Sequence, residues 1–194
     1  MTEEAGRAES PAILADLVDR QYKASVIPMW GNLGAGSILL TANAYHVSLA
    51  EGAAWMCLLL MVMALRLAVN NAYRMARSRD RIDSAWARRW ANRSMAVVLV
   101  NGFVWAAAAP VVADNYDPIA LVVSITTYQG MVMGAVLTMA VHLPSFFAYA
   151  LPSGLSLVLA LGTQGQSGLL ALAACNLIGL VLVSVVAVVT GRSF

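Results

Sequence analysis

The stretch RMARSRDRIDSAWARRWANR, residues 74–93, decides the fold of this 194-residue chain. It carries seven of the chain's twelve Lys and Arg residues against two aspartates, and the sequence on either side is almost wholly apolar. Arginine-dense loops between membrane spans stay on the cytoplasmic side of a bilayer. The stretch therefore predicts both a membrane protein and its orientation. Its arginines are Arg74, Arg77, Arg79, Arg81, Arg88, Arg89 and Arg93.

The composition supports a membrane environment. Hydrophobic residues make up 60% of the chain, charged residues only 11%, and the mean hydropathy is +0.74. Soluble domains are less apolar and carry about twice this share of charge. A soluble core of this size could not bury so much apolar surface, so the solvent of the chain is expected to be lipid.

The hydrophobic blocks predict six spans. Because that number is even and the arginine stretch lies inside, both termini are expected to be cytoplasmic. The links at 48–52 and 113–117 hold acidic but no basic residues, as outer links should. The predicted fold is all-α, a polytopic six-helix transmembrane bundle in a bacterial inner membrane. The spans are expected at about residues 26–47, 53–73, 94–112, 118–141, 145–161 and 168–189.

The two ends of the chain are expected to be cytoplasmic segments. Residues 1–25 predict a polar tail followed by a short amphipathic helix from Ser10 to Ser25. This helix would lie on the inner membrane surface or pack against a partner, or else serve as a solvated lead-in. Residues 191–194 follow the last span at once, and we expect that a cytoplasmic output domain is missing.

A surface helix is expected within the arginine stretch, capped by Asp83 or Ser84. Trp86 and Trp90 are four residues apart and so share one helical face. Tryptophans flanked by arginines suit an inner interface with anionic lipid. Binding of nucleic acid is not expected, because hydrophobic spans tether this basic stretch on both sides.

Several polar side chains are expected in the middle or inner half of the membrane. Burying such groups in hydrocarbon is costly unless each finds a partner. Two interpretations stay open: hydrogen bonds between helices, or a cavity in which Arg66 meets an anionic head group such as a fatty-acid carboxylate. A proton or ion path is disfavoured, because no Asp or Glu lies within a span. The candidate ligand-binding residues are Asn32, Arg66, Asn101, Trp105, Gln129, Tyr149 and Ser153.

Small residues and a proline mark candidate packing sites. Gly130 and Gly134 form a GxxxG pair, a pattern typical of close helix packing or oligomer contacts. Pro152 is expected to kink the fifth span, since proline removes a backbone hydrogen bond. A second stripe of small residues comprises Ala171, Cys175 and Gly179.

The sequence offers no candidate for metal, cofactor or catalysis. His46 and His142 are expected near opposite faces of the membrane, which disfavours a shared haem. No His, Cys and carboxylate side chains are expected at one level for a metal. No GxSxG motif, HExxH motif or pair of intramembrane aspartates is present. This chain alone is therefore not expected to be an enzyme.

The pattern resembles the six-helix N-terminal sensory region of bacterial membrane signalling proteins. In that family a histidine kinase, or an enzyme that makes or degrades cyclic di-GMP, follows the last span. The resemblance implies homodimers, because such outputs work in pairs. The residues that carry it are Arg20-Gln-Tyr22-Lys23, Asn32-Leu-Gly, Trp55, Arg66, Trp90 with Arg93, Gly102 with Trp105, and Pro144, Tyr149 and Pro152.

These observations predict a sensory and regulatory membrane domain. It would detect a lipophilic or membrane-borne signal, bind membrane lipids or a fatty-acid-like ligand, and act on a cytoplasmic signalling domain. The alternatives are a small oligomeric transporter or channel, and a purely structural membrane partner.

Overall fold

Helices form almost all of the computed structural model, which describes residues 11–24, 26–79, 83–115, 117–140 and 142–191. None of the described residues lies in a β-strand, so the described chain is all-α, as predicted. The expected N-terminal tail, the Ser10 cap and residues 192–194 lie outside the described residues. The helices are α1 (Pro11–Ala24), α2 (Val26–Ala42), α3 (Leu49–Arg77), α4 (Ser84–Ala113), α5 (Pro118–Met139), α6 (Leu143–Thr163) and α7 (Ser167–Gly191).

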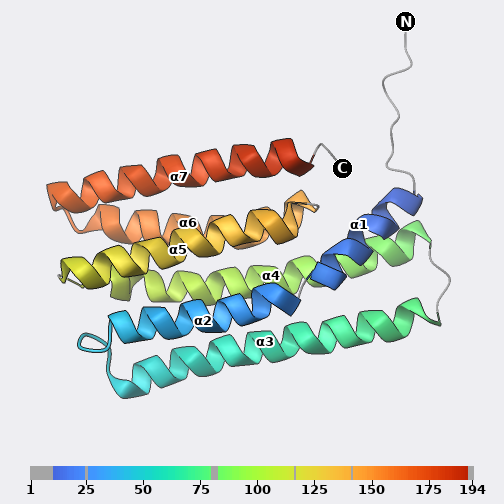
Figure 1. The fold of residues 1–194 in the computed structure, drawn as a ribbon, viewed down its shortest axis with the longest axis horizontal. Helices are drawn as coiled ribbons and strands as arrows, with labels where there is room; N and C mark the ends of the chain where they lie inside the picture. Colours follow the sequence, from blue (N-terminus) through green and yellow to red (C-terminus); the bar gives the residue numbers. More distant parts are fainter. Residues whose placement is uncertain (1–10, 25, 80–82, 116, 141, 192–194) are drawn as a thin grey trace, which may run out of the picture.

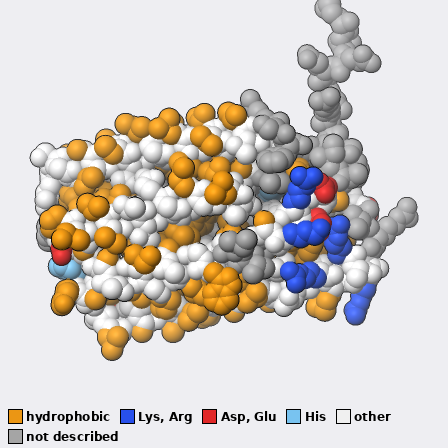
Figure 2. All heavy atoms as spheres, viewed as in Figure 1, with side chains coloured by type: hydrophobic (Ala, Val, Ile, Leu, Met, Phe, Trp, Pro, Cys, Tyr) orange, Lys and Arg blue, Asp and Glu red, His pale blue; other side chains and the backbone are white. Residues whose placement is uncertain are grey.

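Helices α2 to α7 lie side by side along the long axis, and α1 packs across the N-terminal end of α4 (Figure 1). Lys and Arg side chains gather at one end, while hydrophobic side chains cover the rest of the visible face (Figure 2). We call this end the arginine end; it comprises α1, the last turns of α3 and the first turns of α4. Leu137 on α5 is 86% exposed, and Leu159 and Val185 also point outward. This surface suits lipid.

Five helices, α3 to α7, are long and apolar enough to cross a membrane. The molecule is thus a helical, multi-pass membrane protein. α2 corresponds to the expected first span but ends at Ala42, so it has only 17 residues. At about 1.5 Å per residue, such a helix is somewhat shorter than the roughly 30 Å hydrocarbon core.

Side-chain caps begin three of the helices. Asp83 accepts a hydrogen bond from the backbone N–H of Trp86, which confirms the predicted cap. Ser48 and Glu51 form a capping box at the start of α3, and Asp117 caps α5. Such caps satisfy N–H groups that the first turn of a helix leaves unpaired.

The expected separate surface helix is not present. α4 runs without a break from Ser84 to Ala113, so Trp86 and Trp90 lie on the first turns of the same helix that forms the third span. Both rings are buried, with 4% of each exposed. The expectation that they lie against lipid was wrong, because α1 packs over them.

α4 and α6 approach each other closely at Gly102. A Cβ at this position would lie 2.9 Å from Cγ of Pro152 and 3.0 Å from the carbonyl oxygens of Ala148 and Tyr149. Only glycine fits such a contact without a shift of the backbone. Pro152 lies within the continuous helix α6 and packs against α4 here. This contact places the side chain of Tyr149 in the centre of the bundle, where only 1% of it is exposed.

Candidate functional site

Three of the predicted polar residues meet between α2 and α4. The side-chain oxygen of Asn32 accepts hydrogen bonds from Nε1 of Trp105 at 2.8 Å and from Nδ2 of Asn101 at 3.1 Å. All three side chains are buried, and Trp105 is completely enclosed. Trp105 also stands edge-on against Trp55 and Tyr128. A single buried amide on α2 therefore positions two polar side chains of α4.

The same region leaves several polar atoms unpaired. Within the described part of the chain, Nη1 of Arg66, Oδ1 of Asn101 and the hydroxyl of Tyr149 have no hydrogen-bond partner. Arg66 on α3 and Tyr149 on α6 lie close enough to interact electrostatically. A buried polar atom without a partner costs about 1–3 kcal/mol. These residues, with Asn32 and Trp105, form what we call the mid-bundle polar cluster.

A groove of about 260 Å³ opens on this cluster. The buried residues Asn32 and Tyr149 form the floor of the groove, and the groove surface is almost wholly apolar. Its walls are apolar side chains, glycines and Thr138 from the N-terminal half of α2 and the C-terminal half of α5. Arg66 and Asn101 do not line the groove; Asn101 donates to Asn32 on its floor, and Arg66 lies within electrostatic range of Tyr149. The walls comprise Pro28, Gly31, Gly130, Met131, Gly134, Ala135, Leu137, Thr138 and Met139.

The GxxxG pair lines this groove instead of packing against another helix of the chain. A Cβ placed on Gly130 or Gly134 would meet nothing within 4 Å, and the same holds for Gly31 on the opposite wall. The missing side chains leave room for an elongated apolar molecule beside α5.

Gln129 lies apart from the cluster. Its Nε2 donates to Oδ1 of Asn176 on α7 at 2.5 Å, and its amide packs against Gly179. Ser153 donates to the backbone carbonyl of Tyr149 within α6. The structure thus divides the predicted set: Gln129 and Ser153 form hydrogen bonds elsewhere, Asn32 and Tyr149 line the groove, and Arg66, Asn101 and Trp105 belong to the mid-bundle polar cluster without lining it.

The stripe of small residues on α7 faces two environments. Gly179 packs against Gln129, whereas Ala171 and Cys175 are exposed on the outer surface. Cys57 on α3 is also exposed. Within the chain, therefore, only Gly179 of this stripe makes the close contact that the pattern predicts.

A second cluster at the arginine end joins α1 to α3 and α4. Tyr22 and Tyr73 stack in parallel with their ring centroids 3.9 Å apart, and Trp86 and Trp90 pack around them. The hydroxyl of Tyr22 donates to the carbonyl of Trp90 at 3.0 Å. Burial raises the pKa of Tyr22, so this hydroxyl remains a donor. We call these four rings the aromatic clasp.

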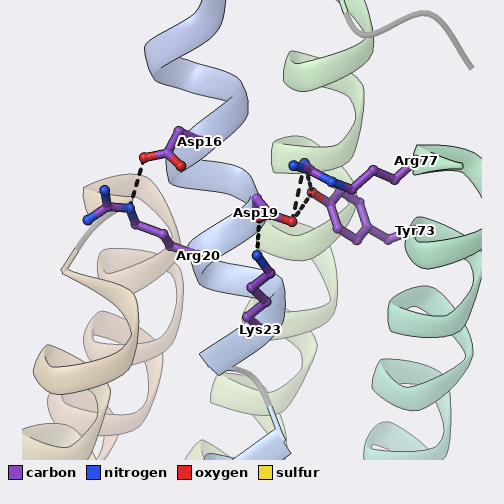
Figure 3. Close-up of polar contacts among 6 residues, drawn as sticks. All are labelled: Asp16, Asp19, Arg20, Lys23, Tyr73 and Arg77. Atoms are coloured by element: carbon purple, nitrogen blue, oxygen red, sulfur yellow. Dashed lines mark hydrogen bonds and ion pairs between the residues drawn. The ribbon is translucent and has the colours of Figure 1, made fainter.

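Ionic contacts of Asp19 join α1 to α3 beside Tyr73, one ring of the clasp (Figure 3). Asp19 on α1 accepts from Tyr73 at 3.1 Å and forms ion pairs with Lys23 at 2.7 Å and Arg77 at 3.2 Å. Burial raises the pKa of Asp19, but hydrogen bonds from Lys23 and Tyr73 and the charges of Arg77 and Lys23 outweigh it. The pKa of Asp19 therefore lies below its ordinary value, so Asp19 remains ionised at neutral pH.

Sequence reasoning missed several buried amides. Near the end opposite to the arginine end, Asn43 bonds to Ser124 and Asn115 and links α2, α4 and α5. Asn70 on α3 is also buried, with 3% exposed. The signal for Asn176 was present, because it is the only amide within the very apolar segment that forms α7. The hydrogen bonds of Asn43 could not be predicted, because the expected first span placed this residue close to a polar outer turn, where water could pair with its amide.

Among the described residues, no three His, Cys, Asp or Glu side chains lie close enough together to hold a metal ion. No protein-family description matches the chain, and comparisons with curated proteins and with solved structures found no match.

Proposed function

We propose that this chain is a membrane-embedded sensory and regulatory domain that detects a lipophilic signal. One observation carries the proposal: an apolar, glycine-lined groove ends on Tyr149, whose buried hydroxyl has no hydrogen-bond partner within the described part of the chain. Ligand pockets typically combine apolar walls with a few placed polar groups. A bundle that needed these groups only for its own stability would pair them with each other.

The ligand that fits best has an apolar chain and a carboxylate. Its chain would lie along the open faces of Gly130 and Gly134, and its carboxylate would accept a hydrogen bond from Tyr149. The guanidinium of Arg66, which interacts electrostatically with Tyr149, would supply a positive charge that attracts the carboxylate. A long-chain fatty acid has this chemistry.

The signal would leave the groove through α2. Pro28, Gly31 and Asn32 line the groove, and α2 begins at Val26, two residues after α1 ends. A shift of α2 would therefore act on α1 and on the aromatic clasp. We propose that α7, together with α1, couples to a cytoplasmic output such as a histidine kinase or a cyclic di-GMP enzyme.

The proposal assumes a definite topology. α2 would be the first of six spans, with the arginine end and both termini cytoplasmic in a bacterial inner membrane. The chain would act as a homodimer, and the exposed Ala171 and Cys175 on α7 offer a surface of small residues for that contact.

Spin labels test the coupling between groove and clasp. Labels would replace the exposed Arg20 on α1 and Arg88 on α4 in a chain whose Cys57 and Cys175 are changed to alanine. Palmitate is expected to change the distance between the labels by several ångströms, and Arg66→Met should abolish the change. An unchanged distance at saturating palmitate would refute coupling. Uptake of palmitate into sealed vesicles that depends on the protein would instead identify a carrier.

A further inference from the structure

A second cavity, of about 390 Å³, lies at the arginine end between α1 and α3. It shares no lining residue with the groove on the mid-bundle polar cluster. On the α1 side it is bordered by Asp19 and Lys23. On the α3 side Asn70, Arg74 and Ser78 follow one another at intervals of four residues, so they share one face of the helix.

Two groups on this face lack partners. Asn70 is 3% exposed, and its Oδ1 has no hydrogen-bond partner within the described part of the chain. Arg74 is exposed and forms no ion pair with any described residue. Among the described residues, the cavity lining therefore combines an exposed guanidinium without an ion pair and a buried side-chain carbonyl oxygen without a hydrogen-bond partner.

The charges around the cavity favour an anion. Lys23, Arg74 and Arg77 line it with three positive charges, and among the described residues Asp19 is the single carboxylate in the lining. Asp19 is already paired with Lys23 and Arg77. The lining thus keeps a surplus of positive charge, and no carboxylate of the described residues forms an ion pair with Arg74.

We propose that this cavity binds the headgroup of an anionic glycerophospholipid with free hydroxyl groups. Its phosphodiester would lie against Arg74, and one hydroxyl would donate to Oδ1 of Asn70. A lipid fits better than a soluble phosphate, because exposed apolar side chains of the same helix, Met75 and Leu67, lie close by in sequence and would contact the acyl chains.

Such a lipid would touch both α1 and α3. It would strengthen the attachment of α1 that the aromatic clasp provides. The proposal does not depend on a ligand in the groove, so the two sites are testable apart.

Native mass spectrometry of the purified full chain tests the proposal. The protein would be titrated with phosphatidylglycerol in micelles that contain an excess of phosphatidylcholine. One phosphatidylglycerol is expected to remain bound. Arg74→Gln and Asn70→Leu should each weaken its binding roughly tenfold, as expected for the loss of one strong hydrogen bond. Neither variant removes an existing side-chain hydrogen bond, so both are expected to fold.

Arg89→Gln is the matched control, since it removes the same charge from an exposed position on α4. Binding of phosphatidylglycerol should survive this change. Equal losses in Arg74→Gln and Arg89→Gln would mean that only net charge matters, and the proposal would fail. It would also fail if no phosphatidylglycerol were retained. Displacement of the lipid by millimolar glycerol 1-phosphate would likewise contradict it, because the site would then bind a soluble phosphate. Palmitate binding should be the same in Arg74→Gln as in the unchanged protein.

Discussion

The aromatic clasp and the mid-bundle polar cluster both hold polar side chains between helices, but they satisfy them differently. In the clasp, the hydroxyl groups of Tyr22 and Tyr73 have partners within the chain, and so has the carboxylate of Asp19 beside it. In the cluster, Arg66 and Tyr149 each keep an unpaired polar atom in the interior. The difference indicates that the clasp serves attachment of α1, whereas the cluster is suited to receive a ligand.

The largest expected effect tests the clasp. Tyr22→Ala removes a buried ring from the stack and should destabilise the attachment of α1 by about 3–5 kcal/mol, as for other buried aromatic residues. Hydrogen exchange in α1 would measure this. The matched control is Tyr45→Ala, because Tyr45 is 100% exposed. Unchanged protection of α1 in Tyr22→Ala would show that the clasp does not hold the helix.

The next prediction tests the contact that positions the floor of the groove. Gly102→Ala should lower the free energy of unfolding by about 1–3 kcal/mol, because its Cβ would press on the backbone of α6. Thermal unfolding in detergent measures the loss. Gly130→Ala, where the Cβ meets open space, should leave the melting temperature nearly unchanged. Equal shifts in the two variants would contradict the close approach.

A third prediction compares two residues of the mid-bundle polar cluster whose replacement should change stability in opposite directions. Arg66→Met removes a buried cation that lacks a full set of partners, so it should raise the stability of the ligand-free protein by about 1 kcal/mol. Asn32→Leu should lower it by a similar amount or more, because it leaves Trp105 and Asn101 without their acceptor. Chemical unfolding of both variants would decide the matter. A loss of stability in Arg66→Met would show that this residue is already satisfied.

The smallest expected effect concerns pH. The pKa of Asp19 is lower in the folded protein than its ordinary value of 3.8, so its ion pairs contribute stability above pH 3.8. This contribution should disappear as the pH falls from 3.8 through the folded pKa. The Asp19→Asn variant should lack this part of the pH dependence. The comparison of both proteins between pH 5 and pH 3 by thermal unfolding measures it, and parallel curves would contradict the assignment.

The arginine stretch and the hydrophobic blocks were sufficient to predict an all-α membrane protein, because lipid demands long apolar helices and charge asymmetry. They also placed Asn32, Arg66, Asn101 and Tyr149 at similar depths. They could not show that Trp86 and Trp90 would be covered by α1, since that contact depends on a stack between Tyr22 and Tyr73, which are 51 residues apart in the numbering. Nor does the depth of a residue in the membrane show which way its side chain points around the helix axis. Gln129 points from α5 toward α7, away from the other predicted residues.

Photolabelling tests the central claim most directly. Palmitate that carries a diazirine in its chain would be bound to the protein in phosphatidylcholine vesicles, irradiated, and the labelled peptides identified by mass spectrometry. We predict labelling of α2 and α5 at groove residues such as Met131 and Leu137, which excess unlabelled palmitate prevents and Arg66→Met abolishes. Labels spread evenly over the outer faces of the helices, and unchanged in Arg66→Met, would contradict the account.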